Sequence, residues 1–261
     1  MPFARVGEVD LFYTDEGAGG PPILFVHGFS CDSHDWMWQL PHFTRSHRVI
    51  ALDLRGHGRS GVPAGGYEPT TFAADISGLL RALDCGPVVA IGHSLGGLIV
   101  STLAVEHPEQ VSAVVSVDPG YLIGDDSALA MQSIRDALKA DPVSTAQALL
   151  SRSYSPASPP HLNAWHMRRL AGVPGDVLFQ TFSNLGPMAG RSVSGPYLRR
   201  RACPVLAIYA NDERVPVEAE LFSDPRSRAF CWPGSGHWLH QERPAEFNTV
   251  VDAWLAELAL G

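Results

Sequence analysis

Short apolar segments alternate with amphipathic helical segments along most of this sequence, and this alternation limits the folds open to it. Continuous apolar segments occupy residues 22–26, 49–52, 88–91, 111–117 and 205–208. Apolar residues recur at helical spacing at residues 72–83 and 247–258. Continuous apolar strands that alternate with helices are typical of a parallel sheet covered by helices on both faces. The sequence therefore predicts an α/β fold, with further strands at residues 9–14 and 228–232.

The segment from about residue 121 to residue 197 departs from this rhythm. It contains short helical patterns at residues 128–139, 144–150, 161–170 and 177–184, without a segment typical of a strand. Ligands bind at the carboxyl ends of the strands in open α/β sheets, and a helical insertion between two strands can cover that edge. We predict a core formed by residues 1–120 and 197–261, and a helical lid formed by residues 121–196.

Composition and charge disfavour several classes of protein. Of the 261 residues 45% are hydrophobic, and the formal net charge of −8 disfavours nucleic acid, because phosphate contacts require clustered Lys and Arg. The short basic run at residues 199–201 fits a solvated helix face. The start of the chain lacks the apolar core of a secretory signal, and no apolar stretch approaches a membrane span. The four cysteines are scattered, so we expect a cytoplasmic protein with reduced cysteines.

The strongest functional signal is the segment Gly92-His93-Ser94-Leu95-Gly96, between an apolar segment and a helical one. A serine on a tight turn between a strand and a helix adopts a strained backbone conformation that exposes its hydroxyl group. Such a turn crowds its flanks, so it requires residues without side chains two positions before and after the serine, as Gly92 and Gly96 are. The amides of the helix that begins there face developing negative charge. We predict that Ser94 is a nucleophile.

A serine hydroxyl is a weak nucleophile unless a base removes its proton. In this architecture the histidine follows both the nucleophile and the acid in the sequence. Of the eleven histidines, His237 and His240 follow the last apolar strand candidates. His237 lies in a loop with Gly234 and Gly236, which let the backbone fold back toward the serine, whereas His240 fits the side of a helix. We predict that His237 is the general base.

The segment His27-Gly28-Phe29 follows the predicted buried strand at residues 22–26. A loop at this point can direct a backbone N–H at the oxyanion, and Gly28 permits the close approach. We predict that the amides of Phe29 and Leu95 form the oxyanion hole and that His27 orients the loop.

Several segments together resemble the α/β-hydrolase superfamily, namely His27-Gly28-Phe29, residues 53–60, residues 92–97, and Gly236-His237 with Glu242-Arg243-Pro244. The sequence looks most like the small bacterial esterase, lactonase and cofactor-free haloperoxidase branch. The match covers nearly the whole chain except the lid, and its motifs are specific for the fold but not for the substrate. The resemblance implies a mostly parallel eight-stranded sheet flanked by helices, with the lid inserted after strand 6.

The resemblance leaves the acid of the triad open. The family usually places it after the strand at residues 205–209, in a Gly-x-x-Asp arrangement, whereas the segment here lacks the glycine and is one residue short. Counting back from the Val-Pro pair that follows selects Asp212, and counting forward from the strand selects Glu213. Some relatives carry the acid one strand earlier, where Asp118 stands in this chain. We take Asp212 as the first choice, with Asp118 and Glu213 as alternatives.

These residues predict a serine hydrolase that cleaves a carboxylic ester or lactone through an acyl-enzyme on Ser94. A serine nucleophile disfavours epoxide hydrolases and haloalkane dehalogenases, which resemble this fold but require a carboxylate. The alternatives are a carbon–carbon bond hydrolase or a perhydrolase on the same triad, or a ligand receptor that uses the hydrolase pocket.

The aromatic and aliphatic side chains of the lid predict a pocket for an apolar or aromatic small-molecule ester or lactone. We expect no metal or organic cofactor, and neither nucleic acid nor a membrane as a partner. The predicted pocket residues are His27, Tyr121, Trp165, Phe179 and Trp238.

Overall fold

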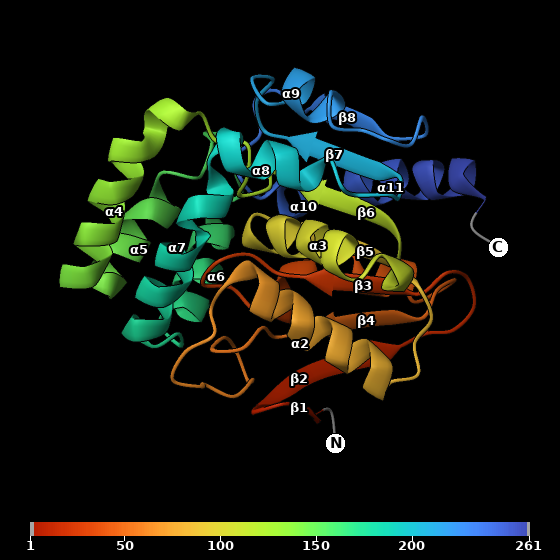
Figure 1. The fold of residues 1–261 in the computed structure, drawn as a ribbon, viewed down its shortest axis with the longest axis horizontal. Helices are drawn as coiled ribbons and strands as arrows, with labels where there is room; N and C mark the ends of the chain where they lie inside the picture. Colours follow the sequence, from red (N-terminus) through yellow and green to blue (C-terminus); the bar gives the residue numbers. More distant parts are fainter. Residues whose placement is uncertain (1–2, 260–261) are drawn as a thin grey trace.

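The computed structural model describes residues 3–259, and within them eight strands form one sheet (Figure 1). The strands in chain order are β1 (Phe3–Val6), β2 (Val9–Glu16), β3 (Ile23–Val26), β4 (Val49–Leu52), β5 (Val88–His93), β6 (Val111–Val117), β7 (Val205–Tyr209) and β8 (Arg228–Cys231). Their spatial order is β1-β2-β4-β3-β5-β6-β7-β8. The pairs β1–β2 and β2–β4 are antiparallel and the other pairs are parallel, so the predicted mostly parallel eight-stranded sheet is confirmed.

The central strands are apolar throughout because both faces of the sheet are covered. Successive side chains of a strand point to opposite faces. In β3, Leu24 and Val26 pack into one hydrophobic core, and Ile23 and Phe25 pack into a second core on the other face. All four side chains are fully buried.

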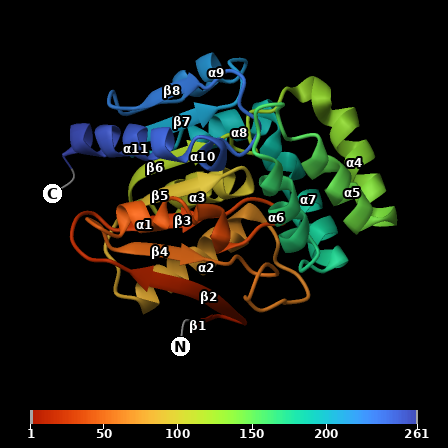
Figure 2. The ribbon, with the colours of Figure 1, turned by 180° about the vertical axis from the view of Figure 1, so that it is seen from behind.

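Helices cover the two faces (Figures 1 and 2). Both α2 (Pro69–Ala82) and α3 (Leu95–Glu106) lie on one face, whereas α1 (Leu40–Phe43), α10 (Leu239–Glu242) and α11 (Pro244–Leu258) lie on the other. The helix α3 is buried along nearly its whole length, which explains why its sequence is apolar all round rather than amphipathic. The helical patterns at residues 72–83 and 247–258 correspond to α2 and α11. Short elements complete the core: η1 (Ser33–Trp36), η2 (Pro108–Gln110) and α9 (Val215–Ala219).

A group of helices is inserted between β6 and β7 and gathers at one end of the sheet (Figures 1 and 2). The inserted elements are η3 (Asp125–Ser127), α4 (Ala128–Ala140), α5 (Pro142–Ser151), α6 (Pro160–Leu170), α7 (Gly175–Ala189) and α8 (Arg191–Leu198). The four helical patterns of the sequence correspond to α4, α5, α6 and α7. Proline begins α5 and α6, where its missing N–H has no intrahelical partner to lose. The sequence pattern did not reveal α8.

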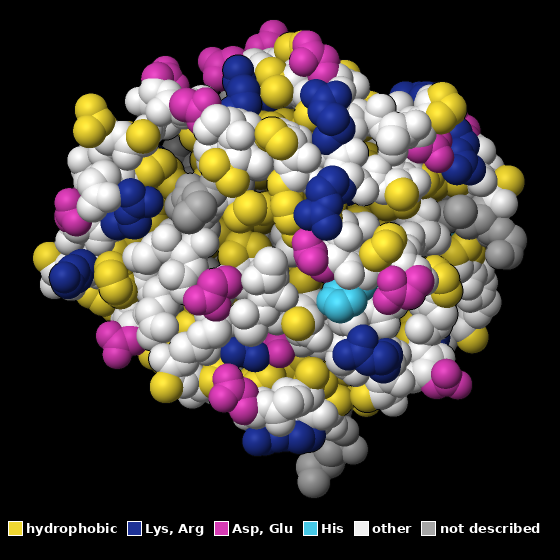
Figure 3. Space-filling model, in the orientation of Figure 1, with side chains coloured by type: hydrophobic (Ala, Val, Ile, Leu, Met, Phe, Trp, Pro, Cys, Tyr) yellow, Lys and Arg dark blue, Asp and Glu magenta, His cyan; other side chains and the backbone are white. Residues whose placement is uncertain are grey.

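The basic run at residues 199–201 is not uniformly solvated, and the prediction of a solvated face was wrong for Arg201. Its side chain is 1% exposed and donates from Nη2 to Oε1 of the buried Glu218 at 2.8 Å. On the face drawn in Figure 3, basic and acidic side chains are interspersed rather than gathered by sign. Within residues 3–259, none of the helices has the length and apolar character that a membrane span requires.

Candidate active site

The loops after β3 and β5 lie side by side, at the point where the strand order reverses. The chain passes from β3 to β4 on one side and then to β5 on the other, and Val26 of β3 pairs with Gly92 of β5. Ligands bind at such a switch point in open α/β sheets, beyond the carboxyl ends of the strands. This arrangement brings the segment that begins at His27 next to the turn that carries Ser94.

Ser94 sits on the sharp turn between β5 and α3 with a left-handed backbone, φ 52° and ψ −113°. A non-glycine residue in this region stores strain, which persists only because the surroundings fix it. A Cβ atom at Gly92 would collide with the carbonyl oxygen of Gly96, and one at Gly96 with that of Val26. The turn therefore requires both glycines, and it presents the Ser94 hydroxyl to a cavity.

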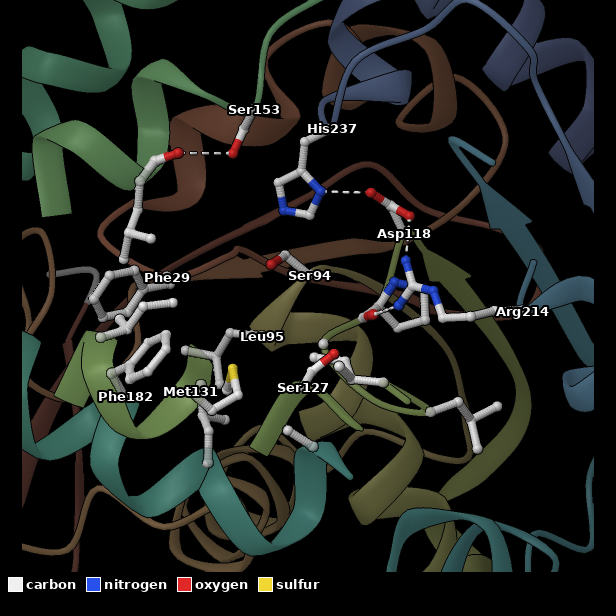
Figure 4. Close-up of a pocket in the computed structure, with 18 of the residues that line it drawn as sticks. Phe29, Ser94, Leu95, Asp118, Ser127, Met131, Ser153, Phe182, Arg214 and His237 are labelled. Atoms are coloured by element: carbon white, nitrogen blue, oxygen red, sulfur yellow. Dashed lines mark hydrogen bonds and ion pairs between the residues drawn. The ribbon is translucent and has the colours of Figure 1, made fainter. Parts of the chain in front are cut away.

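His237 lies in the loop between β8 and α10, and backbone contacts fix the loop on two sides. The His237 amide donates to the carbonyl oxygen of Ser153 at 2.8 Å, and the His237 carbonyl accepts from Nε2 of His93 at 2.9 Å. The ring Nδ1 is 2.6 Å from Oδ2 of Asp118. Because an ionised carboxylate only accepts, Nδ1 carries a hydrogen, and the neutral form of the ring has its lone pair on Nε2. Figure 4 shows the His237 ring with Asp118 on one side and Ser94 on another.

The carboxylate that contacts His237 is Asp118. The prediction that Asp212 is the carboxylate beside His237 was therefore wrong. Asp118 follows β6, whose last residue pairs with both His93 and Ile208 in the middle of the sheet. Asp212 and Glu213 are exposed in the segment after β7, where a tight turn leads directly into α9. The missing glycine and the missing residue were the sequence signal that this segment departs from the usual pattern of the family.

Asp118 is nearly buried, and its charged form is stabilised by its neighbours. Burial by itself would raise the pKa of Asp118, but the hydrogen bond and charge of His237, the charge of Arg214 and the amide of Ala210 lower it to about 2. The carboxyl group is therefore ionised across the physiological range. An ionised carboxylate at Nδ1 fixes the tautomer of the imidazole and stabilises its protonated form.

Phe29 and Leu95 both line the cavity beside Ser94. Neither backbone amide donates a hydrogen bond to another group among residues 3–259. Leu95 is the first residue of α3, where amides have no intrahelical partner. Two free N–H groups at this place are suitable donors to an oxyanion.

The cavity above Ser94 measures about 900 Å³ and is lined mainly by apolar side chains. Phe29, Phe182 and Met131 gather on one side of Ser94, and Arg214 lies on the other side (Figure 4). Further apolar lining comes from the inserted helices and from the segment after β6: Leu122, Ile123, Ile134, Leu149, Leu150, Leu185 and Ala189. Polar residues of the lining include Asp125, Asp126, Ser127, Arg191 and Glu213.

Of the five pocket residues predicted from the sequence, Trp238 lines this cavity and the prediction was wrong for the other four. His27 is buried at the start of the loop after β3, where its Nε2 accepts from the Leu54 amide at 3.0 Å. The Tyr121 hydroxyl turns into the core and donates to Ser116 at 3.0 Å. Trp165 and Phe179 lie on α6 and α7 outside the lining. Helical spacing shows which residues share a face but not which face meets the cavity.

A polar cluster centred on the fully buried Asp35 lies behind the loop of His237. Its Oδ1 accepts from Nη1 of Arg169 at 2.7 Å and from Nε2 of Gln241 at 3.0 Å. Its Oδ2 lies 3.8 Å from Nδ1 of His93. The cluster joins η1, α6 and α10 to the residue that precedes Ser94, and the sequence patterns gave no sign of it.

Asp35, His93 and His240 bring three potential ligand atoms within 4.8 Å of one another, which raises the question of a metal ion. The Arg169 guanidinium already balances the charge of Asp35 at 2.7 Å. A divalent cation on the same carboxylate would face this guanidinium at short range in a weakly screened interior. The residues therefore fit a hydrogen-bonded interior better than a metal centre.

Comparisons with known proteins show similarity to hydrolases. The model of a family described as the alpha/beta hydrolase family matches residues 23–250. A non-heme chloroperoxidase of Streptomyces lividans is 40% identical over 123 residues, which are 45% of this chain and 45% of that protein. This match spans less than half the length of the chloroperoxidase.

Two further relatives match over nearly the whole chain. A 2-(acetamidomethylene)succinate hydrolase of Mesorhizobium japonicum is 29% identical over 251 residues, which are 92% of this chain and 89% of that protein. Among solved structures, Est816, described as an N-acyl homoserine lactone degrading enzyme, has a TM-score of 0.81 and 26% identity. That comparison covers 97% of this chain and 99% of Est816.

Proposed function

Because this chain belongs to the alpha/beta hydrolase family, we propose that it is a serine hydrolase that cleaves a carboxylic ester or lactone through an acyl-enzyme on Ser94. The observation that carries this proposal is the geometry around one serine. Ser94 occupies a strained turn at the cavity, and the hydrogen-bonded pair of His237 and Asp118 lies beside it. The acid of the proposed triad is therefore Asp118.

The reaction begins when Nε2 of His237 takes the proton of the Ser94 hydroxyl and the oxygen attacks the substrate carbonyl carbon. The C–O double bond opens to an oxyanion, which the amides of Phe29 and Leu95 hold. Collapse of this intermediate breaks the bond to the alcohol oxygen, and His237 returns the proton to the leaving alcohol. In a lactone the alcohol stays attached to the acyl group.

Water then attacks the acyl-enzyme, with His237 again as the base, and releases the acid and free Ser94. Asp118 stays ionised throughout, as its pKa of about 2 requires. Its role is to hold the Nδ1–H tautomer and to stabilise the imidazolium in both half-reactions.

The lining of the cavity supports a substrate with a sizeable apolar group. A volume of about 900 Å³ with aromatic and aliphatic walls matches the cavities that bind medium-sized organic ligands. The likeness to Est816, described as degrading N-acyl homoserine lactones, supports the same class, an acyl chain next to a polar head. The polar side chains of the lining offer hydrogen bonds to such a head.

We further propose that residues 121–196 act as a lid. Side chains of α4, α5 and α7 form a large part of the cavity wall. The carbonyl of Ser153, just after α5, also holds the backbone of His237. Movement of the insertion would therefore affect both access to the cavity and the position of the base.

The test is turnover of p-nitrophenyl esters with acyl chains of two to twelve carbons, and of γ-lactones with similar chains. Ser94→Ala should lower kcat more than about 10³-fold, and a fluorophosphonate probe should label the wild type but not this variant. Ser151→Ala, an exposed serine on α5, is the matched control and should keep full activity. A single burst without further turnover would instead support a receptor, and an unlabelled wild type would refute the nucleophile.

A second candidate, perhydrolase activity, is favoured by the 40% identity to a non-heme chloroperoxidase. Hydrogen peroxide would attack the same acyl-enzyme in place of water and yield a peracid and free Ser94. Peroxide-dependent halogenation in acetate buffer that is lost in Ser94→Ala would support it. Halogenation that survives the substitution would exclude the acyl-enzyme route.

A further inference from the structure

Arg214 lies in the segment after β7, where the family usually carries the acid, but its guanidinium reaches across to the segment after β6. Nη2 donates to Oδ1 of Asp118 at 2.7 Å. Nη1 donates to the carbonyl oxygens of Pro119 at 2.5 Å and of Tyr121 at 3.1 Å. No pattern in the sequence marks this residue.

The two oxygens of Asp118 therefore have different partners. Oδ2 accepts from Nδ1 of His237, while Oδ1 accepts from Arg214 and, at 3.4 Å, from the Ala210 amide. Rotation of the carboxylate would break both sets of bonds together. The orientation in which Asp118 meets the imidazole is thus fixed from the side away from His237.

The backbone that carries Asp118 also needs support. Asp118 and Leu122 both have positive φ, 38° and 57°, although neither is glycine. Such residues persist only where surrounding contacts fix them. The carbonyls of Pro119 and Tyr121, which accept from Arg214, lie between these two strained positions.

The guanidinium is itself held in place. It lies over the ring of the buried Tyr209, with 4.7 Å from Cζ to the ring centroid, and the Arg214 side chain is 17% exposed. Both N–H groups of Nη1 donate to backbone carbonyls of the segment from Asp118 to Tyr121, and one N–H group of Nη2 donates to the Asp118 carboxylate. Arg214 borders the cavity, but these bonds direct its donors at the backbone and the acid.

We propose that Arg214 is a positioning residue for the reaction: it orients Asp118 against His237 and braces the strained segment that carries Asp118. This inference rests on the proposed hydrolase function. A planar guanidinium can serve a carboxylate and two carbonyls at once, whereas the single ammonium group of lysine cannot. Arg214 also moderates the stabilisation of the imidazolium, because its positive charge offsets part of the Asp118 charge.

The charged and titratable groups around the His237–Asp118 pair come from several elements. Arg214 and Glu213 come from the segment after β7, and His93 comes from β5 with its ring centroid 4.6 Å from that of His237. Loss of Arg214 removes a positive charge from this group. The imidazolium should then be better stabilised, so the acidic limb of the kcat/KM profile should move to higher pH.

The experiment compares Arg214→Ala, Arg214→Lys and wild type on the best p-nitrophenyl ester, with active sites counted by fluorophosphonate labelling. Arg214→Ala should lower kcat about 10- to 100-fold, as expected for a misplaced catalytic group, with KM changed less than about threefold. Added guanidinium ion should restore part of kcat. The kcat of Arg214→Lys should lie between that of Arg214→Ala and that of the wild type. Arg226→Ala removes an exposed arginine that pairs with Asp224 far from the site, and should match wild type.

A loss of stability alone would leave the pH profile and kcat per labelled site unchanged, and that result would overturn the proposal. A rise in KM at constant kcat would also overturn it, because it would mean that Arg214 binds substrate. If Arg214→Ala does not fold, Arg214→Lys carries the test, and wild-type kcat in that variant counts against the proposal. Failure of the hydrolase proposal is distinct, because the wild type would then neither turn over nor label.

Discussion

Asp118 illustrates how the proposed catalytic site depends on side chains that meet from distant parts of the chain. It follows β6, yet its partners are His237, 119 residues later, and Arg214, 96 residues later. The local signals for Ser94 and His237 were strong because each lies in a glycine-containing turn with a specific conformational need. A carboxylate at a strand end has no comparable local requirement, which is why three candidates remained open.

At this scale the acid can be tested by a pair of variants. Asp118→Asn should lower kcat by roughly 10⁴-fold, because an amide can no longer fix the Nδ1–H tautomer or stabilise the imidazolium. Asp212→Asn, on the exposed residue that sequence spacing preferred, should stay within about twofold of wild type. Steady-state kinetics with a p-nitrophenyl ester measures both.

Comparable losses in the two variants would contradict the assignment of Asp118. Circular dichroism shows whether each variant is folded, and fluorophosphonate labelling shows whether its Ser94 is intact.

Among the elements, α6 depends on the core for its position through a buried ion pair. Arg169 of α6 reaches Asp35 of η1, and Asp35 also accepts from Gln241 of α10. Arg169 therefore lies in the interior, with its side chain 10% exposed. One carboxylate thus connects the helical insertion to two elements of the core behind the loop of His237.

Removal of this carboxylate should destabilise the protein strongly. Asp35→Ala removes the fully buried partner of Arg169 and leaves only Asp32, whose Oδ1 lies 3.3 Å from Nε of Arg169. Breaking a buried pair in this way typically costs up to about 3–5 kcal/mol of unfolding free energy. Urea denaturation of the variant and wild type measures the difference. The double variant Asp35→Leu with Arg169→Met should regain part of the loss, because it removes both charges. A loss below about 1 kcal/mol in the single variant would show that the pair does not fix α6.

For the molecule as a whole, buried histidines couple folding to pH. Burial lowers the pKa of His57 to about 3 and that of His166 to about 4, and it also lowers the pKa of His93 and of His240. The folded protein keeps these rings neutral, whereas the unfolded chain protonates them near the ordinary histidine pKa of about 6.5. Their contribution to stability is therefore complete above about pH 6.5 and is lost as the pH falls toward 4.

We expect the unfolding free energy to fall between pH 6 and pH 5 by roughly 1.4 kcal/mol per pH unit for each histidine that stays neutral. Urea titrations at several pH values in constant ionic strength measure this slope. His166→Gln should reduce the slope by about one such increment. A flat pH dependence would show that the rings are not held neutral.

Much of the fold could be predicted because its determinants are local and periodic. The continuous apolar runs identify strands buried on both faces, and the helical spacing identifies α2, α11 and the helices α4 to α7. The edge strand β1 and the helix α8 were missed. Both are short, and β1 has an exposed and half-buried pattern without the apolar run that marks the central strands.

The sequence by itself determined the α/β class, the sheet, and the positions of Ser94 and His237, because apolar periodicity and glycine placement act over a few residues. Only the tertiary structure decided that Asp118 rather than Asp212 meets His237, that Arg214 meets Asp118, and that Trp238 rather than Tyr121 or Phe179 faces the cavity. These choices depend on strand register and on which helix face turns inward. Both are set by packing between segments far apart in the chain rather than by the local pattern of residues.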